Sequence, residues 1–217
     1  MSRTPVVLIT GFDPFGGEAV NPSQRIAQAL DGEVVAGHRV VGAILPTQFG
    51  ASLPALQALL RRHRPVLVLA IGQAGGREGI SLERVAINLI DARIPDNAGS
   101  QPVDVRIVDN AANAYFSTLP IKAMLQRLHK AKIPAALSQT AGTFVCNQVF
   151  FGLQHALRRR HGVRGGFVHV PYLPEQAAQH AAAPSLPLET MIAAIRLCLE
   201  VALATTGDAH YAAGALD

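Results

Sequence analysis

Two uninterrupted apolar runs constrain the fold of this 217-residue chain more than any other feature. Residues 5–10 read Pro-Val-Val-Leu-Ile-Thr, and residues 65–71 read Pro-Val-Leu-Val-Leu-Ala-Ile. A strand that is apolar on both faces has to be covered on both faces, as in a parallel sheet between two layers of helices. Segment 49–62, between the runs, has the spacing of an amphipathic helix. The alternation predicts an α/β fold, a three-layer α/β/α sandwich with a mostly parallel sheet.

The remaining elements follow the same alternation of strand and helix. Residues 95–117 carry the Pro, Asn and Gly signals of an irregular surface excursion. No repeat, low-complexity tract or linker divides the chain, so we predict a single domain over residues 1–217. Extended segments are expected at 33–45, 80–94, 135–138 and 166–170, and helices at 21–30, 119–130, 149–157 and 188–205.

Composition limits the partners that this chain can have. The net charge of +4 comes partly from basic clusters at 61–64 and 158–161, each at the end of an expected helix, where cations complement the helix dipole. No aromatic residues alternate with them to stack on bases, so we expect no nucleic-acid partner. No apolar run reaches the ~18 residues that span a bilayer, and nothing before residue 5 resembles a signal peptide. We therefore expect a soluble cytoplasmic protein with no membrane partner.

The two cysteines indicate a reducing compartment and no metal centre. Cys146 and Cys198 are 52 residues apart, and no Cys-x-x-Cys or His/Cys cluster has the spacing of zinc ligands. A free thiol persists in a reducing cytoplasm. Cys198 lies on or near the apolar stripe of helix 188–205, where it either packs as a small hydrophobic side chain or forms a disulfide between subunits. We favour the reduced, packed state.

Cys146 is the candidate nucleophile. It directly precedes the apolar pattern at 149, 150, 153, 156 and 157, so it falls at or near the first turn of a helix. Unpaired amides and the helix dipole favour the thiolate there, which is the nucleophilic form of cysteine. The alternative from this position alone is a buried structural cysteine.

His169 and Glu83 are candidate partners of Cys146. His169 lies near the carboxyl end of the expected strand 166–170, where residues of an open parallel sheet converge on a ligand. An imidazole there could deprotonate the thiol and then protonate the leaving group. Glu83, a carboxylate in an extended segment, could orient that imidazole. The alternatives are a core histidine and an exposed edge carboxylate.

The first Gly-rich loop, residues 11–17, favours a small apolar ligand over a phosphate. Its sequence, Gly-Phe-Asp-Pro-Phe-Gly-Gly, matches neither the dinucleotide fingerprint nor the phosphate loop. Phe12 and Phe15 either line an apolar pocket for a small ring or pack onto the sheet.

Taken together, these segments resemble the pyroglutamyl peptidase I family, the pyrrolidone-carboxylate cysteine peptidases. Each motif is short, but their order over roughly residues 6 to 175 makes the set specific. The motifs that carry the resemblance lie at 11–17, 21–23, 72–77, 80–88, 91–97, 142–147 and 167–171.

The resemblance implies a twisted α/β/α sheet, no cofactor, and a homo-oligomer, a tetramer or a dimer. It also implies removal of N-terminal pyroglutamate (5-oxoproline) from peptides through a thioester on Cys146, with His169 as base and Glu83 as its orienting carboxylate. The backbone around Arg93 and the Cys146 amide would form the oxyanion hole. The resemblance implies that Phe12 and Phe15 sandwich the lactam ring, that Gln73 and Asn21 satisfy its N–H and C=O, and that Val145, Ile94 and Phe144 close the pocket.

Two other readings stay open on the residues alone. One is a non-catalytic nucleoside-binding domain on a phosphorylase-like α/β/α fold, in which Cys146 is inert. The other is a thiol amidase acting on a different small acyl group. The Phe-rich first loop and the missing phosphate signature count against the nucleoside domain.

Overall fold

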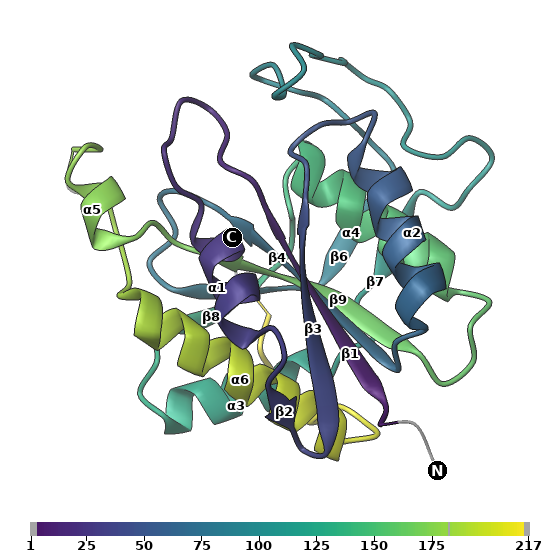
Figure 1. Cartoon of the computed structure of the whole chain (residues 1–217), viewed down its shortest axis with the longest axis vertical. Coiled ribbons are helices and arrows are strands. Elements are labelled where there is room, and N and C mark those ends of the chain that lie inside the picture. The colour runs from purple at the N-terminus through teal and green to yellow at the C-terminus, as the bar shows by residue number, and fades with distance from the viewer. Residues whose placement is uncertain (1–3, 182, 215–217) are drawn as a thin grey trace.

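A central sheet between two layers of helices forms the protein (Figure 1), and the computed structural model describes residues 4–181 and 183–214. Seven strands make up this sheet, in the spatial order β2-β3-β1-β4-β9-β5-β8. In that order they are Val34–Val35, His38–Leu45, Val6–Phe12, Leu67–Gln73, Arg164–Val170, Ile80–Glu83 and Ala135–Ser138.

The central strands are parallel, as the apolar runs predict. Every residue of β1 and of β4 is buried. Strand β1 pairs in parallel with β3 and β4, and β4 pairs in parallel with β9. Strand β5 is the departure, because it runs antiparallel to β9 and parallel to β8. The predicted α/β class with a mostly parallel sheet is confirmed.

The long helices cover the two faces of the sheet (Figure 1). Helices α1, α3 and α6 pack against one face with the odd-numbered side chains of β4, and α2 and α4 pack against the other with Val68 and Ala70. Each face therefore has its own apolar core, as strand alternation requires. The helices are α1 Pro22–Leu30, α2 Ser52–His63, α3 Ile121–Lys130, α4 Val145–Leu157 and α6 Leu188–Ala204.

The turn from β1 into α1 is held by hydrogen bonds that fix the first Gly-rich loop. The Asn21 carboxamide caps α1 by accepting from the Ser23 N–H at 3.0 Å, and it donates to the Asp13 carbonyl at 3.0 Å. The Ser23 hydroxyl accepts from the Phe12 N–H at 3.0 Å. A Cβ on Gly11 would lie 2.2 Å from the Ser23 carbonyl oxygen, so only glycine fits where α1 approaches β1.

Some expected elements differ from the observed ones. Segment 33–45 is a hairpin of β2 and β3, because Ala36 and Gly37 both have positive φ and reverse the chain. Segment 80–94 contains β5 and a separate short strand, β6 (Val85–Ile87). Strand β6 pairs with β7 (Ala114–Phe116), which lies inside the expected irregular excursion. The short helix α5 (Pro174–Ala177) was not predicted.

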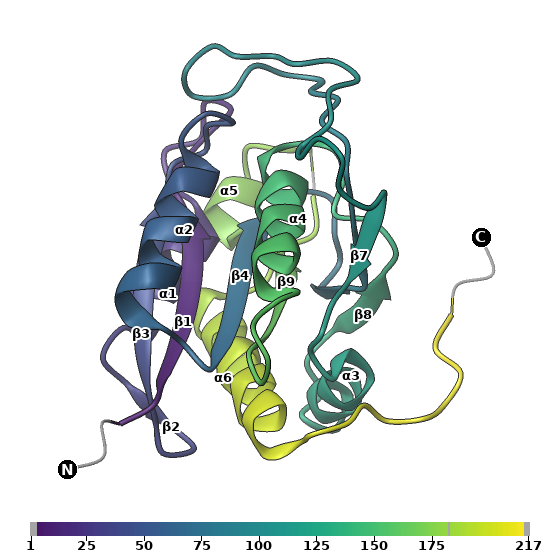
Figure 2. The same cartoon turned by 90° about the vertical axis from the view of Figure 1, so that its right-hand side faces the viewer.

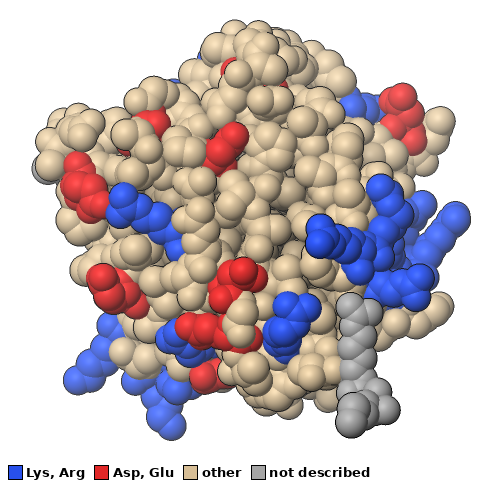
Figure 3. All heavy atoms as spheres, in the orientation of Figure 1, with Lys and Arg blue, Asp and Glu red and all other residues tan. Residues whose placement is uncertain are grey.

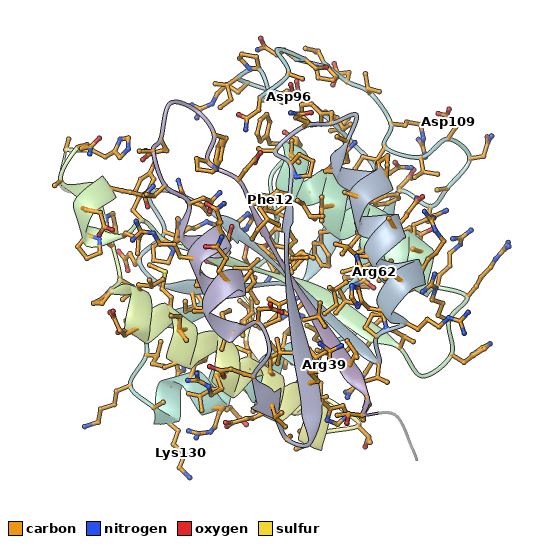
Figure 4. All side chains as sticks on the ribbon, in the orientation of Figure 1. Phe12, Arg39, Arg62, Asp96, Asp109 and Lys130 are labelled. Atoms are coloured by element: carbon orange, nitrogen blue, oxygen red, sulfur yellow. The ribbon has the colours of Figure 1, made fainter. Side chains whose placement is uncertain are left out.

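The excursion between β6 and β7 extends beyond the carboxyl ends of the central strands (Figure 2). Asp96, which lies within this excursion near the top of Figure 4, anchors it. Burial alone would raise the pKa of the Asp96 carboxyl, but hydrogen bonds from the backbone N–H groups of Phe49, Ser100 and Ala98 outweigh burial and lower it. The carboxylate thus ties the excursion to the segment before α2.

Basic side chains gather beside α2 on the surface of the molecule (Figure 3). Arg61, Arg62 and His63 form the last turn of α2, and Arg158 caps α4, as expected for cations at helix ends. Among the described residues, no helix is both long enough and apolar enough to cross a membrane.

Cys198 lies in the core that α6 shares with α1 and α3. It is 1% exposed, and burial raises the pKa of its thiol to about 12. A thiol in this position is neutral and shielded from a second subunit. The placement favours the reduced, packed state over an intersubunit disulfide.

Replacing Cys198 by Ser should leave the reactivity of Cys146 unchanged and lower the free energy of unfolding by about 1–2 kcal/mol, because a hydroxyl enters an apolar site. Urea denaturation and the rate of Cys146 alkylation measure the two effects. A Cys198-dependent dimer band on non-reducing gels of protein alkylated before lysis would contradict this expectation.

Candidate active site

Three elements bring Cys146, His169 and Glu83 together near the carboxyl end of β9. Glu83 is the last residue of β5, and His169 is the penultimate residue of β9. The antiparallel register pairs Ser81 with His169 and Glu83 with Phe167. Glu83 and His169 are therefore diagonal neighbours on one face of the sheet, within reach of two long side chains. Cys146, the second residue of α4, approaches from the helix layer on that face.

The imidazole of His169 connects the carboxylate to the thiol. Its Nδ1 lies 2.8 Å from Glu83 Oε1, and the ring also hydrogen-bonds the Cys146 side chain. With Nδ1 engaged by the carboxylate, Nε2 is the nitrogen available to the thiol. Glu83 is fully buried and His169 is 4% exposed, whereas Cys146 is half-buried. Of the three side chains, that of Cys146 is therefore the most accessible to a ligand.

The protonated form of His169 is strongly favoured. Burial lowers the pKa of this imidazole, but the hydrogen bonds and negative charges of Cys146 and Glu83 outweigh burial and raise it to about 9. At neutral pH the imidazole therefore holds its proton beside the thiol. A protonated imidazole beside a cysteine sulfur is the arrangement that a leaving group needs when a sulfur nucleophile attacks an acyl carbon.

A cavity of about 330 Å³ opens over Cys146 and His169. Its size suits a small ring with a short stretch of backbone. Aromatic and aliphatic side chains and backbone form most of its wall, with charged groups from two loops. The lining residues are Phe15, Gln73, Ala74, Arg77, Asp91, Arg93, Ile94, Ala141, Gly142, Thr143, Phe144, Cys146 and His169.

The aromatic wall consists of Phe15 and Phe144. Their ring centroids lie 6.0 Å apart, and Phe49 supports Phe144 edge-on at 5.2 Å. Phe12 does not line the cavity, since it is 2% exposed and packs on Phe167 in the interior (Figure 4). The expected pair of Phe12 and Phe15 around a ring is therefore replaced, in this cavity, by Phe15 and Phe144.

Of the other residues expected in the pocket, some line the cavity and others are buried away from it. Ile94 and Arg93 line the cavity, whereas Val145 is fully buried in the core below it. Asn21 is also fully buried, and its carboxamide is used within the turn before α1. Asn21 is therefore not placed to bind a ligand in the cavity.

Gln73 borders the cavity, but part of its side chain is already engaged elsewhere. It is the last residue of β4 and not a loop residue. Its Oε1 accepts a hydrogen bond from Gln176 Nε2 at 3.1 Å, and Gln176 Oε1 accepts from the Leu173 N–H at 3.0 Å. The backbone donor settles the orientation of both carboxamides, which leaves only the Nε2 of Gln73 and its main chain for a ligand.

The start of α4 provides backbone donors next to the thiol. The amide of Cys146 lies in the first helical turn, where N–H groups have no carbonyl partner within the helix. The Asn147 side chain accepts from the Ile87 N–H and donates to the carbonyls of Ile87 and Leu89. These bonds fix the helix start against the segment that leads to Arg93.

Sequence reasoning missed two residues of the site. Arg77 lines the cavity, and its Nη2 lies 3.8 Å from Glu83 Oε1. Gly72 lies behind the thiol, because a Cβ there would be 2.8 Å from Cys146 Sγ and 2.8 Å from the ring of Phe167. Both lie in the segment 72–77, a motif in which the resemblance assigns a role to Gln73 alone.

A family model for pyroglutamyl peptidase matches residues 5–205 of this chain. The chain belongs to the pyroglutamyl peptidase family. The resemblance that the sequence motifs carry is therefore confirmed.

Relatives match this chain over nearly its whole length. A pyrrolidone-carboxylate peptidase of Cupriavidus taiwanensis is 54% identical over 214 residues, 98% of this chain and 99% of that protein. The crystal structure of pyroglutamyl peptidase I from Bacillus amyloliquefaciens is similar with a TM-score of 0.91 and 47% identity, covering 94% of this chain and 100% of that one. A variant of pyrrolidone carboxyl peptidase from Pyrococcus furiosus gives a TM-score of 0.89 at 42% identity, covering 92% and 98%.

Replacing Gly72 by Ala should slow alkylation of Cys146 by iodoacetamide by about tenfold or more. The new methyl group displaces Sγ from His169, and misplacements of this size are costly at reacting groups. Gly207→Ala is the matched control, because a Cβ at Gly207 meets nothing within 4 Å. Wild-type alkylation rates in a folded Gly72→Ala protein would contradict the role given to this glycine.

Proposed function

We propose that this protein is a cysteine exopeptidase that removes N-terminal pyroglutamate from peptides, with Cys146, His169 and Glu83 as its catalytic residues. The observation that carries the proposal is the hydrogen-bonded series of thiol, imidazole and buried carboxylate at the floor of a small cavity. Family membership supports the substrate class, since the relatives are named pyrrolidone-carboxylate peptidases.

The reaction proceeds in two steps. The Cys146 thiolate attacks the carbonyl carbon that follows the lactam ring, and the carbonyl electrons move onto oxygen. When the intermediate collapses, the C–N bond breaks and the proton of the His169 imidazolium passes to the leaving amine. Water, deprotonated by the now neutral His169, then attacks the thioester, releases pyroglutamate and restores the thiolate.

Glu83 and the helix start serve these steps without forming bonds to the substrate. Glu83 holds Nδ1 of His169, so that Nε2 faces the reacting sulfur throughout. The Cys146 amide, together with the backbone around Arg93, stabilises the oxyanion. No step requires a cofactor or a metal ion.

The ring is recognised by shape and by amide hydrogen bonds. Pyroglutamate is neutral, with a blocked amine and no free side-chain carboxylate, so an ionic anchor would gain nothing. Phe15 and Phe144 contact the flat ring, and Ile94 closes the cavity. The Nε2 and main chain of Gln73 supply polar partners for the lactam.

Substitutions of the three catalytic residues should separate their roles. Cys146→Ala and His169→Ala should abolish turnover of a pyroglutamyl-coumarin substrate, because each removes a group that exchanges a bond or a proton with the substrate. Glu83→Gln should cause only partial loss, because the carboxamide still contacts Nδ1. Wild-type turnover by Cys146→Ser, which replaces the thiolate by a hydroxyl, would overturn the assignment.

Prolyl substrates should be rejected by orders of magnitude in kcat/KM relative to pyroglutamyl substrates. Proline lacks the ring carbonyl, so the polar groups of the site remain unpaired, and its amine is charged. Paired assays with prolyl- and pyroglutamyl-coumarin measure the ratio. Comparable kcat/KM values would contradict recognition of the lactam while leaving the thiol mechanism intact.

A homo-oligomer, either a dimer or a tetramer, and a cytoplasmic location stay predictions from the resemblance and the composition. Three exposed apolar side chains on and beside the excursion, Val103, Val105 and Phe116, are consistent with contact between subunits.

A further inference from the structure

The loop between β4 and β5 holds Arg77 in a fixed place. A Cβ on Gly75 would lie 2.3 Å from the Tyr172 ring, and one on Gly79 would lie 2.3 Å from the Pro134 carbonyl oxygen. Gly76 has a φ of +82°, a conformation that other residues rarely adopt. The glycines thus let the loop press against its neighbours, which limits where the Arg77 backbone can lie.

The Arg77 guanidinium is bound on three sides. Its Nη1 donates to Ser138 Oγ at 3.2 Å, and its Nη2 donates to the Thr140 carbonyl at 3.3 Å. The same Nη2 lies 3.8 Å from Glu83 Oε1. The Arg77 side chain is 35% exposed and Glu83 is fully buried, so the guanidinium covers the carboxylate from the cavity side.

Glu83 has few other partners for its negative charge. Its Oε1 contacts both His169 and Arg77, while its Oε2 is buried without a hydrogen-bond partner among the described residues. Within the described part of the chain, Arg77 is the only Arg or Lys in an ion pair with Glu83. A buried carboxylate is costly unless a cation compensates it. When His169 becomes neutral during the reaction, Arg77 is the cation that remains beside Glu83.

We propose that Arg77 is a positioning residue for the proposed reaction and acts through Glu83. Its positive charge offsets the charge of the carboxylate and thereby sets the pH range in which the thiolate–imidazolium pair exists. The inference rests on the proposed function, because its turnover assay uses a pyroglutamyl substrate. Besides Arg77, the charged groups that face the pair are Glu83 from β5 and, across the cavity, Asp91 and Arg93.

The sign of the effect follows from the charge of the guanidinium. A nearby cation favours the thiolate and disfavours the imidazolium. Without it, the thiolate forms at a higher pH, and His169, whose pKa is already raised to about 9 by Cys146 and Glu83 against burial, keeps its proton to a still higher pH. Both limbs of a bell-shaped pH profile therefore move in the same direction, toward higher pH.

The experiment compares Arg77→Met with the wild type in two assays. One is the pH dependence of kcat/KM for a pyroglutamyl-coumarin substrate, and the other is the pH dependence of Cys146 alkylation by iodoacetamide, which needs no substrate. We expect both limbs of the turnover profile, and the alkylation midpoint, to rise by roughly 0.5–1 pH unit, since the guanidinium is partly exposed. Below the acidic midpoint, this shift is about a 3- to 10-fold loss of rate.

Two further variants control for charge and for folding. Arg77→Lys keeps the charge but loses the fork that binds Ser138 and Thr140, so its midpoints should shift by less than half as much as those of Arg77→Met. Arg62→Met removes one positive charge from the outer surface of α2 (Figure 4) and should leave every midpoint unchanged. Thermal unfolding of each variant shows whether the fold is kept.

Each outcome has a distinct meaning. Wild-type midpoints in Arg77→Met, or a lower plateau without a shift, would overturn the proposal, because a purely structural role changes the rate and not the midpoints. If Arg77→Met does not fold, unchanged alkylation and turnover midpoints in a partly active Arg77→Gln would overturn it as well. A protein that cleaves no pyroglutamyl substrate refutes the proposed function, while the alkylation profile still tests Arg77.

Discussion

The hydrogen bond between Glu83 and His169 is the interaction on which the rest of the site depends. A fully buried carboxylate is tolerated only where its charge is compensated, and here an imidazole and a guanidinium share one of its oxygens. The sheet creates this contact by running β5 antiparallel to β9, which places the two side chains diagonally on one face. The antiparallel pairing of β5 with β9 is therefore the feature that brings Glu83 and His169 together.

Glycines without side chains allow the thiol and Arg77 to approach this pair. Gly72 leaves the space that Sγ occupies, and Gly75 and Gly79 let the following loop carry Arg77 toward Glu83. A larger side chain at any of the three would separate the nucleophile from its partners or displace the cation. The segment 72–77 thus sets the positions of Cys146 Sγ and of the Arg77 guanidinium, although it contains neither the proposed nucleophile nor the proposed base.

The sequence was sufficient for the layers and for the three candidate catalytic residues, and insufficient for the direction of several pocket side chains. Buried strands such as β1 and β4 are visible as apolar runs, and Cys146 and His169 were found from their places at a helix start and a strand end. The reversal at Ala36 and Gly37 has no strong turn signal in a Val-rich segment, so the hairpin was missed. Phe12 was expected beside Phe15 because both belong to the loop 11–17, but Phe12 is the last residue of β1 and packs on Phe167 in the interior.

The charges of the site suit a reaction on a neutral substrate. The charges of the proposed thiolate and imidazolium cancel, as do those of Glu83 and Arg77, and those of Asp91 and Arg93 at the same cavity. In the proposed reaction, one negative charge moves from Cys146 to the carbonyl oxygen when sulfur attacks, and none is created. Cys146 lies in the first turn of α4, whose amides favour negative charge. In the proposed reaction, the start of this helix therefore suits both the nucleophile and the oxyanion without reorganising, which is the condition for effective electrostatic catalysis.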